Sequence, residues 1–129
     1  MPEPLVIDDR LLDALAQKES GNDPTAIGDE GLRYPAYGAF QMRRPAYLDV
    51  TRAHPELADQ TLEESLQDAT RQRTLAQAYL ELLRDHYGLD TLDELLQGYN
   101  AGPTAVRRGN VPESSRAYAT EIQALMGAP

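Results

Sequence analysis

The sequence contains no cysteine, and this absence excludes a disulfide framework and any metal site built on thiolates. A chain without cysteine suits a reducing compartment but does not require one. The two histidines, His54 and His86, have no neighbours at metal-ligand spacing. We therefore predict neither a metal site nor an organic cofactor.

Positive charge is also scarce, since 12 Lys and Arg stand against 21 Asp and Glu and give a net charge of -9. Nucleic-acid binders and proteins of anionic membranes usually carry basic patches, so both classes of partner are disfavoured. No apolar run approaches the roughly 20 residues of a membrane span. The opening, "MPEPLVIDDR", lacks the basic and apolar regions of a signal peptide. We expect either that no cleaved signal exports the protein or that the signal lies outside this sequence.

Apolar residues make up 41% of the 129 residues, which suits one domain over residues 1–129 with a real core. The first helix is predicted to begin at Asp8 or Asp9 and to end near Ser20. Its apolar stripe consists of Leu11, Leu12, Leu15 and Ala16. Glycine and proline then recur too densely between residues 21 and 45 for a helix of ordinary length. Two short pieces there, 25–28 and 37–42, are predicted to pair as a small ribbon.

The rest of the chain carries helical signals. A helical turn is predicted over residues 46–53. "TLEE" from Thr61 is a capping box that opens the longest helical pattern, which runs to Gly88, and "TLDE" from Thr91 is a second box. Pro112 leads the final helix. The fold class predicted from these patterns is mainly α (α+β), with a small β, glycine-rich insert after the first helix.

A glutamate ends the first predicted helix. Glu19 stands where unpaired helix carbonyls carry partial negative charge, which disfavours an ionised carboxylate. Partial burial would act in the same direction, so both effects would raise the pKa of this carboxyl and suit a general acid. On local sequence alone, a solvated residue at a helix end is the stronger interpretation. The motifs downstream reverse that balance.

Two downstream motifs, "YGAFQM" at 37–42 and "GYNAGP" at 98–103, carry groups that a carbohydrate site needs. Gly38 permits close backbone approach and Gln41 supplies an amide. Tyr99 and Asn100 add an aromatic face and a second amide at a helix end. Each has a structural explanation when taken singly: a surface amide, a core ring, a helix stop. The motifs in this order favour a glycan site.

The segments "ESG" at 19–21, "GAFQM" at 38–42 and "YNAG" at 99–102 resemble the catalytic domain of soluble lytic transglycosylases (SLT), in the lysozyme-like superfamily. Tyr118, in "RAYATEI", stands where that family has a late tyrosine, and the resemblance spans residues 8–125. It implies a lysozyme-like helical domain that cuts peptidoglycan at the β-1,4 bond from N-acetylmuramic acid to N-acetylglucosamine. Glu19 would be the catalytic acid/base and Ser20 would orient it. The implied glycan-binding residues are Ser20, Gln41, Tyr99, Asn100 and Tyr118.

The chain also departs from the SLT pattern. Phe40 replaces a methionine, and the stretch from Glu19 to Gly38 is several residues longer than usual. In these features it resembles invertebrate-type lysozymes, which have an aspartate downstream of the glutamate. Asp29 would then be a second catalytic carboxylate and would permit hydrolysis. Alternatively, Asp29 is a turn residue in "IGDEG", and a transglycosylase needs no second carboxylate, so both reactions stay open.

The sequence therefore predicts a peptidoglycan glycosidase, either a lytic transglycosylase or a muramidase, that acts on the bacterial cell wall in the periplasm or outside the cell. The alternative is a non-catalytic glycan-binding module, or a structural module of a virion or secretion apparatus, that retains the fold. We expect a monomer, and the acidic balance suits delivery by a larger machine. Arg33, Arg43 and Arg44 either steer substrate carboxylates or belong to a solvated face.

Overall fold

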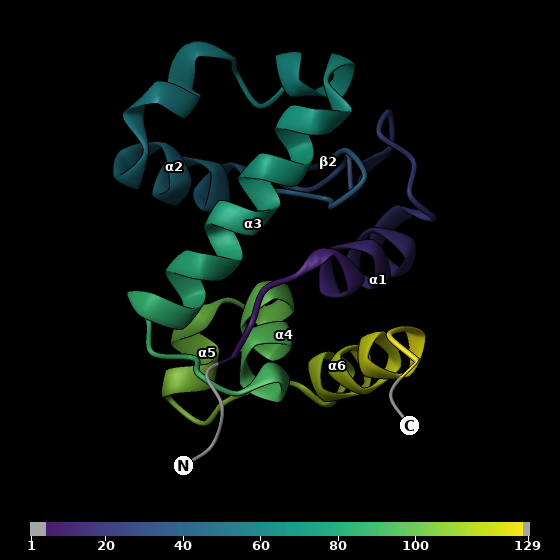
Figure 1. Ribbon diagram of the computed structural model, residues 1–129, viewed down its shortest axis with the longest axis vertical. Coiled ribbons are helices and arrows are strands. Elements are labelled where there is room, and N and C mark those ends of the chain that lie inside the picture. The colour runs from purple at the N-terminus through teal and green to yellow at the C-terminus, as the bar shows by residue number, and fades with distance from the viewer. Residues whose placement is uncertain (1–4, 128–129) are drawn as a thin grey trace. The chain divides into compact units, whose positions relative to one another are not determined.

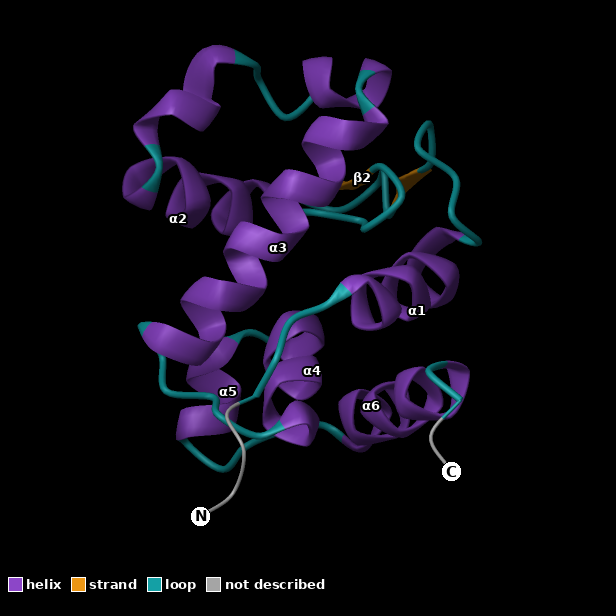
Figure 2. Cartoon of the chain, viewed as in Figure 1, coloured by secondary structure: helices purple, strands orange, loops and turns teal. Residues whose placement is uncertain are grey.

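The computed structural model describes residues 5–127, which form a mainly helical chain with one two-stranded sheet (Figures 1 and 2). This confirms the predicted fold class and the place of the β insert after the first helix. The elements are, in order, α1 (Asp9–Ser20), β1 (Ile27–Gly28), β2 (Ala36–Tyr37), α2 (Arg44–Ala53), the 3-10 helices η1 (Pro55–Asp59) and η2 (Glu64–Gln67), α3 (Ala69–Asp85), α4 (Leu92–Ala101), α5 (Pro103–Arg107) and α6 (Glu113–Leu125).

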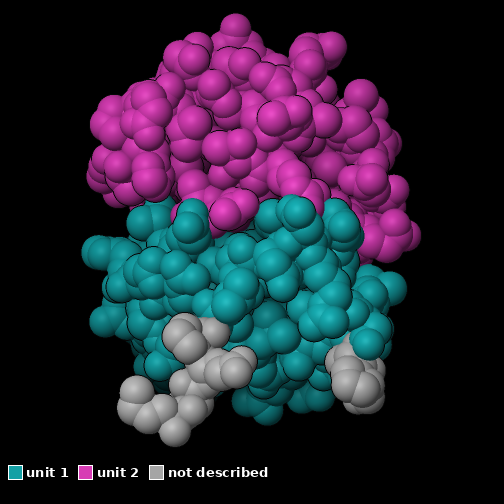
Figure 3. Space-filling model, viewed as in Figure 1, with its two compact units in different colours: residues 1–14, 80–129 teal, residues 15–79 magenta. Residues whose placement is uncertain are grey.

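The chain divides into two compact units, which Figure 3 shows in different colours. Unit 1 comprises residues 1–14 and 80–129, and unit 2 comprises residues 15–79. The helices α1 and α3 each contribute residues to both units. The single domain predicted over residues 1–129 stays a prediction.

The first helix follows its sequence pattern closely. Asp8 is the capping residue, because its Oδ1 accepts the backbone N–H of Leu11 at 3.0 Å. All four residues of the predicted apolar stripe are buried. The helix ends as predicted at Ser20. Gly21 follows with a φ of 68° and donates its N–H to the carbonyl of Gln17 at 3.0 Å.

The predicted ribbon of the insert forms, but it is shorter than expected. Strands β1 and β2 pair antiparallel, with Ile27 opposite Tyr37 and Gly28 opposite Ala36. Residues 37–42 do not continue as a strand. Tyr37 and Met42 instead exchange both backbone hydrogen bonds, at 2.9 and 3.0 Å, so the segment closes on itself. This tight loop requires the positive φ angles of Gly38 (82°) and Gln41 (51°).

The longest helix begins later than its sequence pattern suggested. Thr61 and Glu64 do form the predicted capping box, with reciprocal hydrogen bonds of 3.0 and 2.8 Å. This box opens the short 3-10 helix η2 rather than α3. Asp68 then adopts a non-helical conformation and caps a new helix by accepting the N–H of Arg71 at 3.0 Å. Leu75 and Leu83 are buried as expected, whereas Leu66 is half-buried.

In unit 1, α4 packs against α5 and α6. One hydrogen bond of the second predicted capping box is present: Thr91 Oγ1 accepts the N–H of Glu94 at 3.2 Å. Pro112 precedes α6 as predicted. Gly98 lies in the close packing of α4, because a Cβ there would stand 2.4 Å from Leu89 Cδ1. The buried apolar side chains of these helices are Leu95, Leu96, Tyr118, Ala119 and Ile122.

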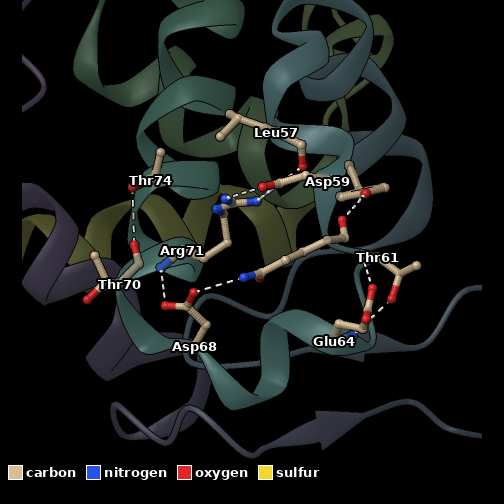
Figure 4. A network of polar contacts seen from close by, with 10 residues as sticks. Leu57, Asp59, Thr61, Glu64, Asp68, Thr70, Arg71 and Thr74 are labelled. Atoms are coloured by element: carbon tan, nitrogen blue, oxygen red, sulfur yellow. Dashed lines mark hydrogen bonds and ion pairs between the residues drawn. The ribbon is translucent and has the colours of Figure 1, made fainter.

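A polar network joins η1 to the start of α3 in unit 2 (Figure 4). The Arg71 guanidinium donates to Asp59 Oδ1 at 2.6 Å and to the Leu57 carbonyl at 3.3 Å. The side chain of Arg71 lowers the pKa of Asp59 by this hydrogen bond. The pKa of Asp68 is lowered mainly by the backbone N–H of Arg71, with help from the Gln60 side-chain amide at 3.0 Å. Both carboxyls are therefore stabilised as anions in the folded chain.

Because the pKa values of Asp59 and Asp68 are lowered, the stability of the folded chain should depend on pH. The folded chain binds protons at Asp59 and Asp68 less readily than the unfolded chain does, so the free energy of unfolding should fall as the pH drops below about 4. Asp68→Asn should flatten that dependence, as measured by urea unfolding between about pH 6 and about pH 3. Gln77→Ala, at an exposed and uncharged position of α3, should leave the slope unchanged. An unchanged slope for Asp68→Asn would contradict the expectation.

Candidate active site

The end of α1 is fastened to the 37–42 loop by Ser20. Its Oγ donates to the carbonyl of Ala39 at 2.8 Å and accepts the N–H of Asp23 at 2.9 Å. Glu19 precedes it in the last turn of α1, and both side chains are half-buried. Ser20 thus fixes the helix end that carries Glu19 relative to the segment that carries Gln41.

Gln72 completes the attachment of the same loop, and the sequence reasoning missed it. Its side chain is 5% exposed, and its Oε1 accepts the Ala39 N–H at 2.9 Å. Its Nε2 donates to the carbonyls of Ser65 at 2.7 Å and Pro24 at 2.8 Å. The N–H and C=O of Ala39 are therefore both bound by side chains, from α3 and α1. A sequence signal existed, because Gln72 is a polar residue on the same helix face as Leu75.

The Gln41 side chain lies across the insert. Its Nε2 donates to the Gly38 carbonyl at 3.0 Å, and it is half-buried. A Cβ on Gly28 would stand only 2.3 Å from Gln41 Oε1, so β1 accommodates this amide through the absence of a side chain. Gly38, where the sequence predicted a close approach, also has no room for a side chain, because a Cβ there would stand 2.7 Å from the Gln72 side chain.

Asp29 is exposed and occupies a turn position with a φ of 54°. Its Oδ2 forms an ion pair with Arg43 Nη2 at 2.5 Å, and Arg43 also donates to the Tyr34 carbonyl. Arg43 therefore contacts both ends of the 29–34 loop. Arg44 pairs with Glu63. Both arginines face acceptors of their own chain.

The remaining predicted residues belong to unit 1. Tyr99 is half-buried and Asn100 is exposed, both in the last turn of α4, and Tyr118 is buried in α6. Ser115, which the sequence reasoning did not single out, donates from its Oγ to Asn100 Oδ1 at 2.7 Å.

The seven predicted residues fall into two groups. Unit 2 holds Glu19, Ser20, Asp29 and Gln41, whereas unit 1 holds Tyr99, Asn100 and Tyr118. Within residues 5–127, no cluster of three or more His, Cys, Asp or Glu is arranged to hold a metal ion. None of the helices in that range has the length and apolarity needed to cross a bilayer.

The helical fold with its small insert is that of a lysozyme-like domain. It is similar to the crystal structure of the 70 kDa soluble lytic transglycosylase of Escherichia coli, with a TM-score of 0.79 and 20% sequence identity. The match covers 94% of this chain and 21% of that one, so this chain spans about a fifth of its length. The chain belongs to the transglycosylase SLT domain family, whose model matches residues 5–122. No curated protein matches it significantly.

Replacing Gly38 should disrupt the loop that carries Gln41. Gly38→Ala combines a φ of 82° with a Cβ only 2.7 Å from the buried Gln72 side chain, so we expect a loss of about 2–4 kcal/mol in the free energy of unfolding. Gly31→Ala is the matched control, because a Cβ there meets nothing within 4 Å. Denaturant unfolding of both variants measures the difference. Equal stabilities would show that the loop adapts.

Removing the Gln72 side chain should be comparably costly. Gln72→Ala leaves the Ala39 N–H and the Pro24 carbonyl without this buried partner and removes one of the two donors to the Ser65 carbonyl, so we expect a loss of about 2–4 kcal/mol. Gln77→Ala, at an exposed position of the same helix, should change stability by less than about 0.5 kcal/mol. Urea unfolding compares the two, and a small effect at Gln72 would mean that water replaces its hydrogen bonds.

Proposed function

We propose that the chain is a lytic transglycosylase that cleaves peptidoglycan at the β-1,4 bond between N-acetylmuramic acid and N-acetylglucosamine, with Glu19 as general acid and then general base. Family membership and fold support the class of reaction. The observation that carries the role of Glu19 is the attachment of its helix end, through Ser20, to the loop bearing Gln41. A catalytic carboxyl has to be held in place before substrate arrives, because misplacement costs rate.

In the proposed reaction, the Glu19 carboxyl donates its proton to the glycosidic oxygen as the bond to the muramic acid C1 breaks. The resulting carboxylate then accepts the proton of the muramic acid 6-hydroxyl while O6 bonds to C1. The products are a 1,6-anhydro-muramic acid end and a free 4-hydroxyl on N-acetylglucosamine, and no water is consumed. Gln41, Tyr99, Asn100 and Tyr118 would contact the glycan, and Ser20 would position Glu19.

The ion pair between Asp29 and Arg43 favours internal cyclisation over hydrolysis in this proposal. A carboxylate that serves as nucleophile or base has to be available to the anomeric carbon or to a water beside it. Asp29 is instead engaged by a guanidinium in an exposed turn. A muramidase that uses Asp29 would have to break that pair, and it is the competing hypothesis.

Digestion of purified peptidoglycan, with products read by mass spectrometry, tests the reaction. We expect anhydro-muramic products from the wild type, a loss of at least about 100-fold for Glu19→Gln, and near-normal rates for Asp29→Asn. The unfolding midpoint of each variant is measured alongside, which separates a loss of catalysis from a loss of folding.

Each other outcome supports a different hypothesis. Reducing-end products that disappear in both variants would establish a muramidase with two carboxylates. If the chain binds peptidoglycan but cleaves no type of cell wall, the result would support the alternative of a non-catalytic glycan-binding module. Full activity in Glu19→Gln would remove Glu19 from the mechanism.

A further inference from the structure

The hydrogen bond between Ser115 and Asn100 joins a buried hydroxyl to an exposed amide. Ser115 is 2% exposed in the first turn of α6, whereas Asn100 is exposed in the last turn of α4. The Ser115 Oγ donates to Asn100 Oδ1 at 2.7 Å. The oxygen end of this amide is thus bound on the protein side.

This bond determines which end of the amide is available to a ligand. An asparagine side chain has an acceptor oxygen and a donor NH2 at nearly isosteric positions. With Oδ1 occupied by Ser115, the Nδ2 donors are the group that Asn100 offers outward. Acceptor oxygens on a ligand are therefore the groups that we expect this amide to bind, because a ligand donor could use only the remaining lone pair of Oδ1.

Both partners stand on packed helices rather than on loops. The helices α4 and α6 pack against each other, and the Ser115 N–H is itself bound to the Pro112 carbonyl at 3.0 Å. Ala119, one turn further along α6, is fully buried. The amide is therefore oriented before a ligand arrives, which lowers the entropy cost of binding.

We propose that Ser115 is a positioning residue that holds Asn100 as a hydrogen-bond donor to an acceptor oxygen of an amino-sugar glycan. The identity of the ligand rests on the proposed function, whereas the orientation of the amide rests on the Ser115 contact. The acceptor is either an acetamido carbonyl or a ring hydroxyl, and two oligosaccharide probes distinguish them.

A double-mutant cycle on glycan binding tests the proposal. The full chain carrying Glu19→Gln, which prevents turnover, is titrated calorimetrically with tetra-N-acetylchitotetraose and with cellotetraose, which lacks acetamides. Ser115→Ala should raise the dissociation constant of the bound probe about tenfold, and in an Asn100→Ala background it should have no further effect. A Ser115–Asn100 coupling seen with the chitin tetramer alone assigns the acetamido carbonyl, and an equal coupling with both probes assigns a hydroxyl.

Three variants separate positioning from folding. Ser114→Ala is the matched control, because Ser114 is exposed in the same helical turn. Ser115→Thr keeps the hydroxyl and should restore binding. Asn100→Asp should bind more weakly than Asn100→Ala, because it replaces the outward donor with an acceptor, and this comparison holds even if Ser115→Ala does not fold.

The proposal is overturned if neither probe binds, if Ser115→Ala binds normally, if it weakens binding equally without Asn100, or if Asn100→Asp binds at least as well as Asn100→Ala. Peptidoglycan digestion by the chain with Glu19 intact is scored separately. Coupling without digestion would reject only the proposed reaction, and digestion without coupling would reject only the role of Ser115.

Discussion

The peptide groups of Ala39, bound on both sides by helix side chains, are the constraint on which unit 2 depends. Its sheet has only two residues in each strand, so backbone pairing alone cannot fix the 37–42 loop. Gln72 and Ser20 supply what the sheet lacks, and Gln72 also binds two further carbonyls. Because a buried amide with all its partners is strongly directional, this arrangement fixes one geometry for the loop.

The proposed reaction requires few groups besides a loop and a helix end that are held in place. A reaction that uses the substrate's own hydroxyl requires one proton-transferring carboxyl and a precise placement of the sugar. The charged residues of the insert are used differently, since Arg43 joins Asp29 to the Tyr34 carbonyl and shapes the longer loop. Asp29, which the sequence suggested as a second catalytic carboxylate, thus helps to hold this loop through its ion pair with Arg43.

The sequence patterns succeeded where structure is local and failed where two local signals compete. Asp8 and Thr91 cap helices as their patterns predicted. The box at Thr61 also formed, yet Asp68 offered a second cap seven residues later and the longest helix began there. The 37–42 segment was predicted to pair as part of a ribbon, but two positive φ angles turn it back on itself.

The sequence by itself determined the places of α1, α2, α4 and α6, the insert and the order of the motifs, because capping and apolar spacing act over a few residues. Only the tertiary structure decided which side chains hold the motif residues. Gln72 meets Ala39 across 33 positions, Ser115 meets Asn100 across 15, and Arg43 meets Asp29 across 14. Partners so far apart leave no mark in local periodicity, since chain packing alone brings them within hydrogen-bonding distance.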